Sequence, residues 1–395
     1  MKNNVKVAVG VVLGVVVGSV ATVGASSLIP FGPTNINASS SIDAETKIDY
    51  IHTLIDENYI FEYSDDELID SMIDGYVYGL GDPYSTYFNE EEYKKFMEST
   101  EGNYVGIGCS VTADPEDGLI TVVVPFEDGP AYKAGIKAGD KIISVNGTEV
   151  YGSELDVAVS MMKGEEGTEV TVGVLSAETG EEISYTIVRG QIIIDTVEHK
   201  MLDNNVGYIE ISAFDEVTTE QFIEAYDELN EKNMESLVLD LRNNPGGLLN
   251  VVSDIADILV PEGTIVYTED KAGNQEYIKS DKNQIEIPMV VLVNENSASA
   301  SEVLAGAIKD YNVGTLVGET TFGKGIVQRL FRLTDGTAVK LTIAEYFTPS
   351  GYALHGKGIE PDFVVDVEDE VSYNASSLTL EEDLQLQKAL EILSK

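Results

Sequence analysis

Cysteine, histidine and basic residues are scarce in this 395-residue chain, and each shortage excludes a class of site. The single cysteine, Cys109, excludes an internal disulfide and a cysteine-rich zinc site. Lys and Arg number 24 against 69 Asp and Glu, giving a formal net charge of −45. A surface this acidic repels nucleic acid, so we expect no nucleic-acid partner, and no motif implies a metal or cofactor.

The three histidines also argue against a histidine-dependent serine enzyme. His52 lies in a segment with helical periodicity, His199 in a polar stretch, and His355 in a glycine-rich loop with no obvious carboxylate to orient it. No Gly-x-Ser-x-Gly motif occurs in the chain. If serine chemistry is present, its base is expected to be another residue type.

The N-terminus contains the one long apolar run without charge. It extends from Val7 to about Ala25, behind Lys2 and Lys6, and can just span a bilayer as a helix. Because it is longer than a usual signal core, we expect a membrane anchor at residues 1–29, with a cleaved signal peptide as the alternative. A linker at 30–43 follows, and the positive flank predicts that the remainder of this single-pass protein lies outside the cytoplasm.

Three regions of different periodicity follow the linker, which predicts an α/β multidomain protein. Apolar residues repeat at three and four positions in residues 44–102, indicating a helical domain. Residues 103–190 change to strands and turns. Residues 191–372 alternate strands (206–211, 235–241, 288–293) with helices (218–230, 248–259), and residues 373–395 form a closing helix with an apolar face at Leu384, Leu386, Ala389, Leu390 and Leu393.

The segment GPAYKAGIKAGDKIISVNG, residues 129–147, resembles a PDZ domain. Pro130 can start a short helix, Gly135 can end it in a left-handed cap, and Asn146-Gly147 predicts a type I′ hairpin. The resemblance implies that the loop Val105-Gly106-Ile107-Gly108 binds a peptide's C-terminal carboxylate, while the peptide adds a strand to the sheet. The alternative is a plain β domain in which the glycines serve only turns.

Three turns at predicted strand ends carry unusual residues: LDLRNNPGG at 239–247, NENSASASE at 294–302 and GETTFGKG at 318–325. Each also has an interpretation without peptidase chemistry. The first can be a tight glycine turn, the second a capping box from Ser299 to Glu302, and the third a phosphate loop. The phosphate loop is disfavoured because Gly325 replaces the magnesium-binding Ser or Thr, and because the following residues are β-like rather than helical. A buried lysine that loses its proton can instead activate a serine hydroxyl.

Together these blocks resemble the C-terminal processing peptidases of the tail-specific protease family, from about Gly79 to the end of the chain. The matching stretches are LGDPYSTY at 80–87, the PDZ segment, DLRNNPGG at 240–247, SASASE at 297–302, GETTFGKG at 318–325 and GKGIEPD at 356–362. The resemblance implies an α/β core of crotonase/ClpP-like architecture, protein or peptide substrates with exposed C-termini, and a homodimer paired through terminal helices.

The resemblance also implies the site residues. Ser299 would be the nucleophile, Lys324 the base and Gln328 the residue that positions the lysine. Amides of Gly246, Gly247 and Ala300 would form the oxyanion hole, and Asp310 would have a structural role.

This chain departs from many relatives at two positions, with Asn296 in place of glycine and Tyr352 in place of arginine. Four residues of extended strand span roughly 13 Å, so Lys324 and Gln328 can touch only if the backbone bends near Gly325. A catalytically inactive PDZ scaffold remains the main alternative function, and a nucleotide hydrolase a more distant one.

Overall fold

The computed structural model describes residues 43–368, 372, 375 and 378–394. Residue contacts divide the chain into two units, Met1–Ser64 and Asp65–Lys395. The anchor expected at residues 1–29 and the linker up to residue 42 lie outside the described residues. Within the described part, no helix combines the length and the apolar character needed to cross a membrane.

The first unit contributes one described helix, α1 (Ala44–Asn58), which Asp43 caps by accepting a hydrogen bond from Thr46 N at 2.9 Å. None of its residues is buried. The apolar residues that predicted the helix, Ile48, Ile51 and Leu54, are more than 40% exposed.

Residues 65–102 are less purely helical than predicted. Helices α2 (Asp65–Tyr78) and α3 (Glu90–Glu101) flank a short strand, β1 (Thr86–Phe88). This strand pairs antiparallel with β18 (Ala338–Phe347), more than 240 positions later. The helical periodicity gave no signal for it because the strand is three residues long and its partner is distant.

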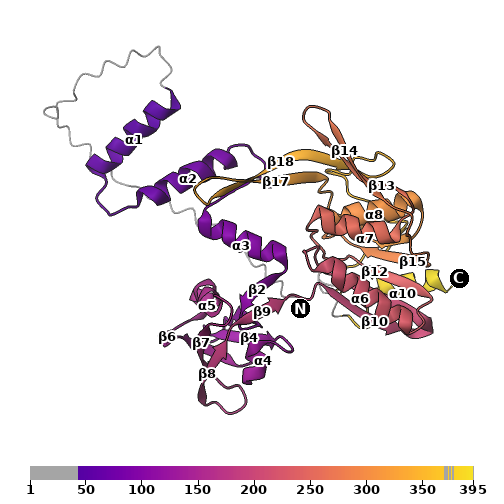
Figure 1. The fold of residues 1–395 in the computed structure, drawn as a ribbon, viewed down its shortest axis with the longest axis horizontal. Coiled ribbons are helices and arrows are strands. Elements are labelled where there is room, and N and C mark those ends of the chain that lie inside the picture. The colour runs from indigo at the N-terminus through magenta and orange to yellow at the C-terminus, as the bar shows by residue number, and fades with distance from the viewer. Residues whose placement is uncertain (1–42, 369–371, 373–374, 376–377, 395) are drawn as a thin grey trace, which may run out of the picture. The chain divides into compact units, whose positions relative to one another are not determined.

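A six-stranded antiparallel sheet forms the region predicted to resemble a PDZ domain (Figure 1). Its main path runs β3-β4-β5-β7-β8, comprising Cys109–Ala113, Ile120–Pro125, Lys141–Val145, Glu169–Leu175 and Glu182–Val188, and β6 (Thr148–Glu149) pairs with β5. Helices α4 (Pro130–Ala134) and α5 (Leu155–Met162) accompany it. The expected turns are confirmed, because Gly135, Asn146 and Gly147 all have positive φ. A separate pair, β2 (Asn103–Gly106) with β9 (Gly190–Ile193), borders this region.

The α/β core is built on a second six-stranded sheet, in the order β10-β11-β12-β15-β16-β19. These strands are Val197–Leu202, Val206–Ile211, Ser236–Asp240, Met289–Val293, Thr315–Gly318 and Phe363–Val364, and all neighbours are parallel except β10 with β11. Every residue of β12 and β15 is buried, as expected for a parallel sheet covered on both faces.

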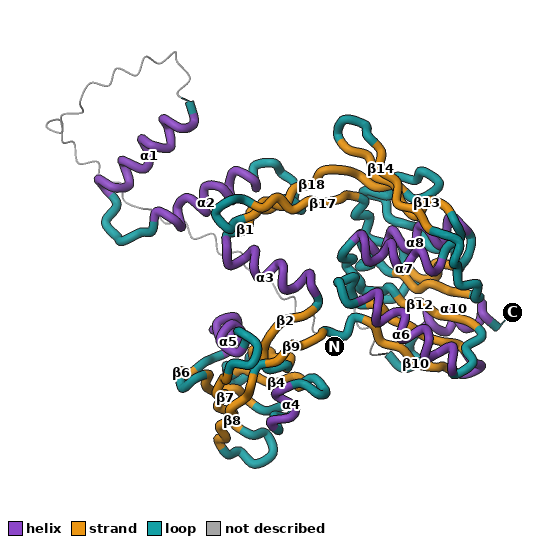
Figure 2. The backbone as a smooth tube through the Cα atoms, viewed as in Figure 1, coloured by secondary structure: helices purple, strands orange, loops and turns teal. Residues whose placement is uncertain are grey.

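Successive residues of these strands serve opposite faces. Leu237 and Leu239 of β12 pack with α6 (Thr218–Glu231), α7 (Leu249–Leu259) and α8 (Ala300–Tyr311). Val238 faces the other way and packs with α10 (Leu384–Leu393). Figure 2 shows these helices and a further sheet, formed by β13 (Gly263–Asp270), β14 (Gln275–Ser280), β17 (Ile326–Arg332), β18 and β1.

Helix α10 uses the apolar face that the sequence suggested for pairing subunits. Leu386 and Ala389 are buried against the chain's own sheet, and Leu390 and Leu393 pack beside them. Of the five apolar residues in that face, Leu384 is the exposed one. The expected homodimer stays a prediction, and this face contributes to the fold of the single chain.

Candidate active site

The three unusual turns follow the carboxyl ends of parallel neighbours in the core sheet, where sites of α/β folds gather. The turn at 241–247 follows β12, the turn at 294–299 follows β15, and the loop at 319–325 follows β16. A cavity of about 490 Å³ brings them together. Its lining includes five residues predicted for the site, Gly247, Ser299, Ala300, Lys324 and Gln328.

Ser299 lies directly before α8, with φ 54° and ψ −112°. A positive φ is unusual for a residue with a side chain, and such strain persists only where the surroundings hold the backbone. Its backbone is held on both sides, since Ser299 N donates to Glu302 Oε2 at 2.9 Å and the Ser299 carbonyl accepts from Glu302 N at 2.9 Å. The hydroxyl is thereby presented at the positive end of the helix dipole.

Glu302 links the serine turn to the lysine loop. Its side chain is fully buried. Besides Ser299 N, its carboxylate accepts hydrogen bonds from Thr321 Oγ1 at 2.6 Å, Gly323 N at 2.7 Å and Lys324 N at 2.8 Å. The sequence predicted only the helix-capping contact. The other three contacts fix the lysine loop against the nucleophile turn, and no local pattern announces them.

Tyr346, in β18, joins the same two segments through their carbonyl groups. Its hydroxyl lies within hydrogen-bond distance of the Ser299 carbonyl, at 2.7 Å, and of the Lys324 carbonyl. Burial raises the pKa of this phenol well above its ordinary value, so it remains a donor. Sequence reasoning missed Tyr346, which lies in an ordinary alternating strand.

Lys324 is half-buried, and its Nζ lies 4.7 Å from the centre of the Tyr84 ring. Desolvation lowers the pKa of Lys324, and the positive charge of Lys340 lowers it further, while Glu302 and Asp82 oppose the shift. Lys340 lines the same cavity, with its Nζ about 5 Å from the ring centres of Phe88 and Phe96. In the described part of the chain, Lys324 forms no ion pair, and its desolvation and the charge of Lys340 both favour the neutral amine.

Ser299, Lys324 and Gln328 share the cavity without direct hydrogen bonds between their side chains in the described structure. Gln328 Nε2 instead donates to the Ile326 carbonyl at 3.4 Å, within its own strand. The pairing of β17 with β18 shifts register between Val327 and Gln328. The side chains are therefore neighbours in one pocket, in an arrangement that is not yet bonded for proton transfer.

The predicted oxyanion amides differ in their engagement. Gly246 N donates to Asn244 Oδ1 at 2.8 Å. Gly247 N and Ala300 N have no recorded partner in the described residues, and both residues line the cavity. A Cβ on Gly246 would lie 2.9 Å from Ala300 N, so glycine permits the close approach of the two turns.

The predicted peptide-binding loop is divided in a similar way. Val105 and Gly106 belong to β2 and pair with β9. The carbonyls of Ile107 and Gly108 accept bonds from Ala131 N and Phe126 N, while their own amides have no recorded partner among the described residues. The following strand, β3, is at the end of its sheet. Vacant amides beside an edge strand are what strand addition by a peptide requires.

Other residues singled out by the sequence have defined positions. Asp310 Oδ2 accepts a bond from Ser350 N at 2.8 Å. Asn296 Nδ2 donates to Asn243 Oδ1 at 3.0 Å, connecting two of the site turns. The Tyr352 hydroxyl donates to the Gly358 carbonyl at 3.2 Å. None of the three histidines lines the cavity.

Comparisons with known proteins assign three parts of the chain to families. Residues 205–365 match the model of peptidase family S41, residues 121–176 that of the PDZ domain, and residues 31–92 that of the activating protease CtpB N-terminal domain. The chain is 37% identical to the carboxy-terminal processing protease CtpA of Bacillus subtilis over 374 residues, covering 93% of this chain and 79% of the relative.

A second Bacillus subtilis protein, carboxy-terminal processing protease CtpB, is 37% identical over 360 residues, covering 90% of this chain and 74% of the relative. Among solved structures, a putative S41 protease from Bacteroides fragilis superposes with a TM-score of 0.51. It is 15% identical and covers 87% of this chain and 97% of its own. This last similarity concerns the fold alone.

Proposed function

Since this chain belongs to the carboxy-terminal processing proteases of peptidase family S41, we propose that it is a serine endopeptidase that binds the C-terminal tails of proteins through its PDZ domain and cleaves near them by a Ser-Lys mechanism. The observation that carries the proposal is the single cavity lined by Ser299, a lysine of lowered pKa and two amides with no recorded partner.

In the proposed reaction the neutral Lys324 amine takes the proton of Ser299 Oγ as Oγ bonds to the scissile carbonyl carbon. The amides of Gly247 and Ala300 donate to the oxygen that becomes negative. When the carbon–nitrogen bond breaks, the Lys324 ammonium returns the proton to the departing amine. Water then attacks the acyl-enzyme as Lys324 accepts its proton, and the Lys324 ammonium passes a proton to Ser299 Oγ as the bond between Oγ and the acyl carbon breaks.

Gln328 enters the proposal as the residue that orients Lys324 once the cavity is assembled. In the described arrangement Gln328 bonds within its own strand, so assembly requires β17 to move. A peptide that binds the PDZ domain more tightly in the assembled state than in the unassembled state would shift the protein toward the assembled state. In the same proposal, a free C-terminus binds to the amides of Ile107 and Gly108 and along the edge of β3.

The location outside the cytoplasm, the membrane anchor and the homodimer are also proposals. The first two depend on the uncharged run at Val7 to Ala25. The homodimer finds support in the many large apolar side chains that are exposed between residues 44 and 80. Exposed apolar patches commonly mark an interface. Solution mass and accessibility to external protease test these points directly.

The decisive experiment is cleavage of an unfolded test protein ending in apolar residues, with wild type, Ser299→Ala and Lys324→Ala. We expect both variants to lose activity by at least about 10³-fold while remaining folded. Amidation of the substrate C-terminus should weaken cleavage if the PDZ loop binds a carboxylate. If wild type, like the two variants, binds the test protein and never cleaves it, the inactive scaffold would be favoured.

A further inference from the structure

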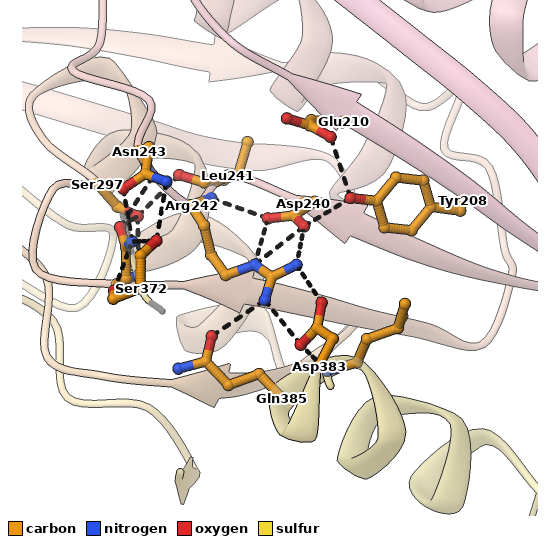
Figure 3. Close-up of polar contacts among 12 residues, drawn as sticks. Tyr208, Glu210, Asp240, Leu241, Arg242, Asn243, Ser297, Ser372, Asp383 and Gln385 are labelled. Atoms are coloured by element: carbon orange, nitrogen blue, oxygen red, sulfur yellow. Dashed lines mark hydrogen bonds and ion pairs between the residues drawn. The ribbon is translucent and has the colours of Figure 1, made fainter. Parts of the chain in front are cut away.

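Arg242, in the turn that follows β12, is buried on the side of the sheet that carries α10 (Figure 3). Its Nε donates to Asp240 at 3.0 Å, and its Nη2 donates to both Asp240 and Asp383. Its Nη1 donates to Asp383 at 2.9 Å and to Gln385 at 3.2 Å. All five N–H groups of the guanidinium therefore have acceptors.

Two of these acceptors come from the far end of the chain. Asp383 and Gln385 are 141 and 143 positions beyond Arg242. Asp383 is also the N-cap of α10, since its Oδ1 accepts from Leu386 N at 2.9 Å. One carboxylate thus begins the C-terminal helix and binds the arginine of the site turn.

The turn that Arg242 begins leads directly to the site. Asn244, two residues on, accepts from Gly246 N through its side chain. Its carbonyl accepts from Ala298 N at 3.0 Å and from Ser301 Oγ at 2.9 Å. A displacement of Arg242 would therefore reach the Gly247 amide along the turn and the Ser299 turn through Asn244.

The C-terminal segment touches these turns at a second point. The Ser372 carbonyl accepts from Asn243 Nδ2 at 3.0 Å, and its hydroxyl oxygen accepts from Asn294 Nδ2 at 3.1 Å. Figure 3 shows Ser372 beside Asn243 and Asp383 beside the guanidinium of Arg242. Neither Ser372 nor Asp383 lines the cavity.

Stability alone does not account for the second carboxylate. Asp240 by itself balances the charge of Arg242, so Asp383 adds a buried negative charge that must be desolvated. Buried ion pairs gain little net stability, because desolvation offsets their attraction. Their directional hydrogen bonds nevertheless fix one geometry.

We propose that Asp383 is a positioning residue of the active site: through Arg242 it holds the turn at 243–247, so that the C-terminal helix must be docked before the Gly247 amide faces Ser299. This inference rests on the proposed function for its catalytic consequence. Its structural part, the hold of α10 on the turn, stands independently of any cleavage.

The test variant is Asp383→Asn in the full chain. Asparagine caps a helix as well as aspartate does, so α10 keeps its cap while the charge facing Arg242 is lost. We expect kcat to fall at least tenfold with KM within twofold. The matched control is Glu382→Gln, which removes the neighbouring exposed carboxylate and leaves Arg242 untouched; its kcat should equal that of wild type.

A second readout separates this proposal from the proposed function. Amide hydrogen exchange in residues 243–248 should quicken at least tenfold in Asp383→Asn and not in Glu382→Gln, whether or not the protein cleaves anything. Unchanged exchange in Asp383→Asn would overturn the proposal even if kcat fell, because the effect would not pass through the turn. A silent wild type with quickened exchange in the variant would reject the proteolysis and retain the positioning.

Should Asp383→Asn fail to fold, Gln385→Leu removes a milder acceptor from the same guanidinium and should give about threefold changes in both readouts. Arg242→Lys keeps the charge without the forked geometry. Combining it with Asp383→Asn should cost little more than Arg242→Lys alone, because Asp383 acts through Arg242 in this proposal. Additive losses in kcat would contradict the proposed route.

Discussion

Two glycine turns in this chain offer backbone amides to an oxygen anion, and they are supported in different ways. The turn at 105–108 lies in the PDZ domain, and the turn at 243–247 lies in the peptidase core. In each, a glycine has positive φ, at Gly108 and at Gly246 and Gly247. In each, two backbone amides in or beside the turn have no recorded partner among the described residues.

The PDZ turn is held by backbone bonds and apolar packing. Its carbonyls accept from Ala131 N and Phe126 N, and the Ile192 side chain packs against Gly108. The catalytic turn is held by buried polar side chains, including Asn244 and Arg242. A binding loop can shift and lose some affinity, whereas an oxyanion hole displaced by 1 Å loses much of its rate. Buried polar side chains, whose desolvation costs free energy, therefore support the turn that requires a fixed geometry.

Among the changes that test this comparison, Glu302→Ala is expected to have the largest effect on activity and stability. The change leaves four buried donors without their acceptor, at about 1–3 kcal/mol for each one that stays unsatisfied. We expect kcat to fall by more than about 10²-fold and the melting temperature to drop, measured by peptide cleavage and thermal unfolding.

The control for that experiment is Glu228→Ala, an exposed glutamate in α6. Surface changes of this kind usually alter stability by less than about 0.5 kcal/mol. If Glu302→Ala behaved like this control, Glu302 would be a helix cap and nothing more.

Gly247→Ala tests the catalytic turn directly. A Cβ there would lie 2.3 Å from the Phe214 carbonyl oxygen, which is backbone and cannot rotate away. We expect about a 10²-fold loss in kcat, the amount typical for losing one oxyanion donor. Gly273→Ala is the matched control, since Gly273 also has positive φ and its Cβ would meet nothing within 4 Å; it should lose stability only.

Gly108→Ala makes the corresponding change in the PDZ turn. Its Cβ would meet the end of the Ile192 side chain at 2.7 Å, which can shift. We expect KM for a tailed substrate to rise roughly tenfold, about 1.4 kcal/mol of binding free energy, with kcat at saturation nearly unchanged. A loss of kcat as large as that of Gly247→Ala would abolish the distinction between the two turns.

The smallest expected effect concerns pH, and Glu210 is its source. The Tyr208 hydroxyl lies 2.7 Å from Asp240 and 3.1 Å from Glu210. One hydroxyl hydrogen cannot serve two carboxylates, so a proton on Glu210 completes the pair. Burial raises the pKa of Glu210, as does the charge of Asp240 and of Glu198 in β10, while the Tyr208 contact and Arg242 lower it.

Because the pKa of Glu210 is higher in the folded protein than in the unfolded chain, its contribution to stability is complete below the ordinary glutamate pKa. The contribution is lost as pH rises toward the folded-state pKa. Glu210→Gln should remove that pH dependence. In the PDZ domain, burial raises the pKa of Tyr104 and Cys109 to about 12, so that turn should not respond near neutral pH. Unfolding measured from about pH 3.5, below the ordinary glutamate pKa, to about pH 8 checks both statements.

Much of this molecule was predictable because local patterns decide it. The strand at 206–211, the helix starting at Thr218 and the left-handed cap at Gly135 agree with the structure. The position of Ser299 between a strand and a helix was also predicted. Each follows from periodicity, glycine conformation or a cap, which involve neighbours in the sequence.

The remainder depends on contacts between distant residues. Ser299 and Glu302 were interpreted as a capping box, and the contact of Glu302 with Ser299 N exists, yet the bonds of Glu302 to Thr321, Gly323 and Lys324 span 19 to 22 positions. Tyr346 and Lys340 looked like ordinary strand residues until the fold placed them against the site. Periodicity cannot report such contacts, because they exist only after the sheets have assembled.

The separation of 141 residues between Arg242 and Asp383 also has a consequence for the chain while it is being synthesised. At about 5–20 residues per second, Arg242 waits roughly 7 to 30 seconds for its second carboxylate to be synthesised. During the last part of that interval, after Lys324 has been synthesised, the nascent chain holds both Ser299 and Lys324 without the contact that we propose aligns the turn. If the proposal holds, the protease would gain its full activity only after Asp383 has been synthesised.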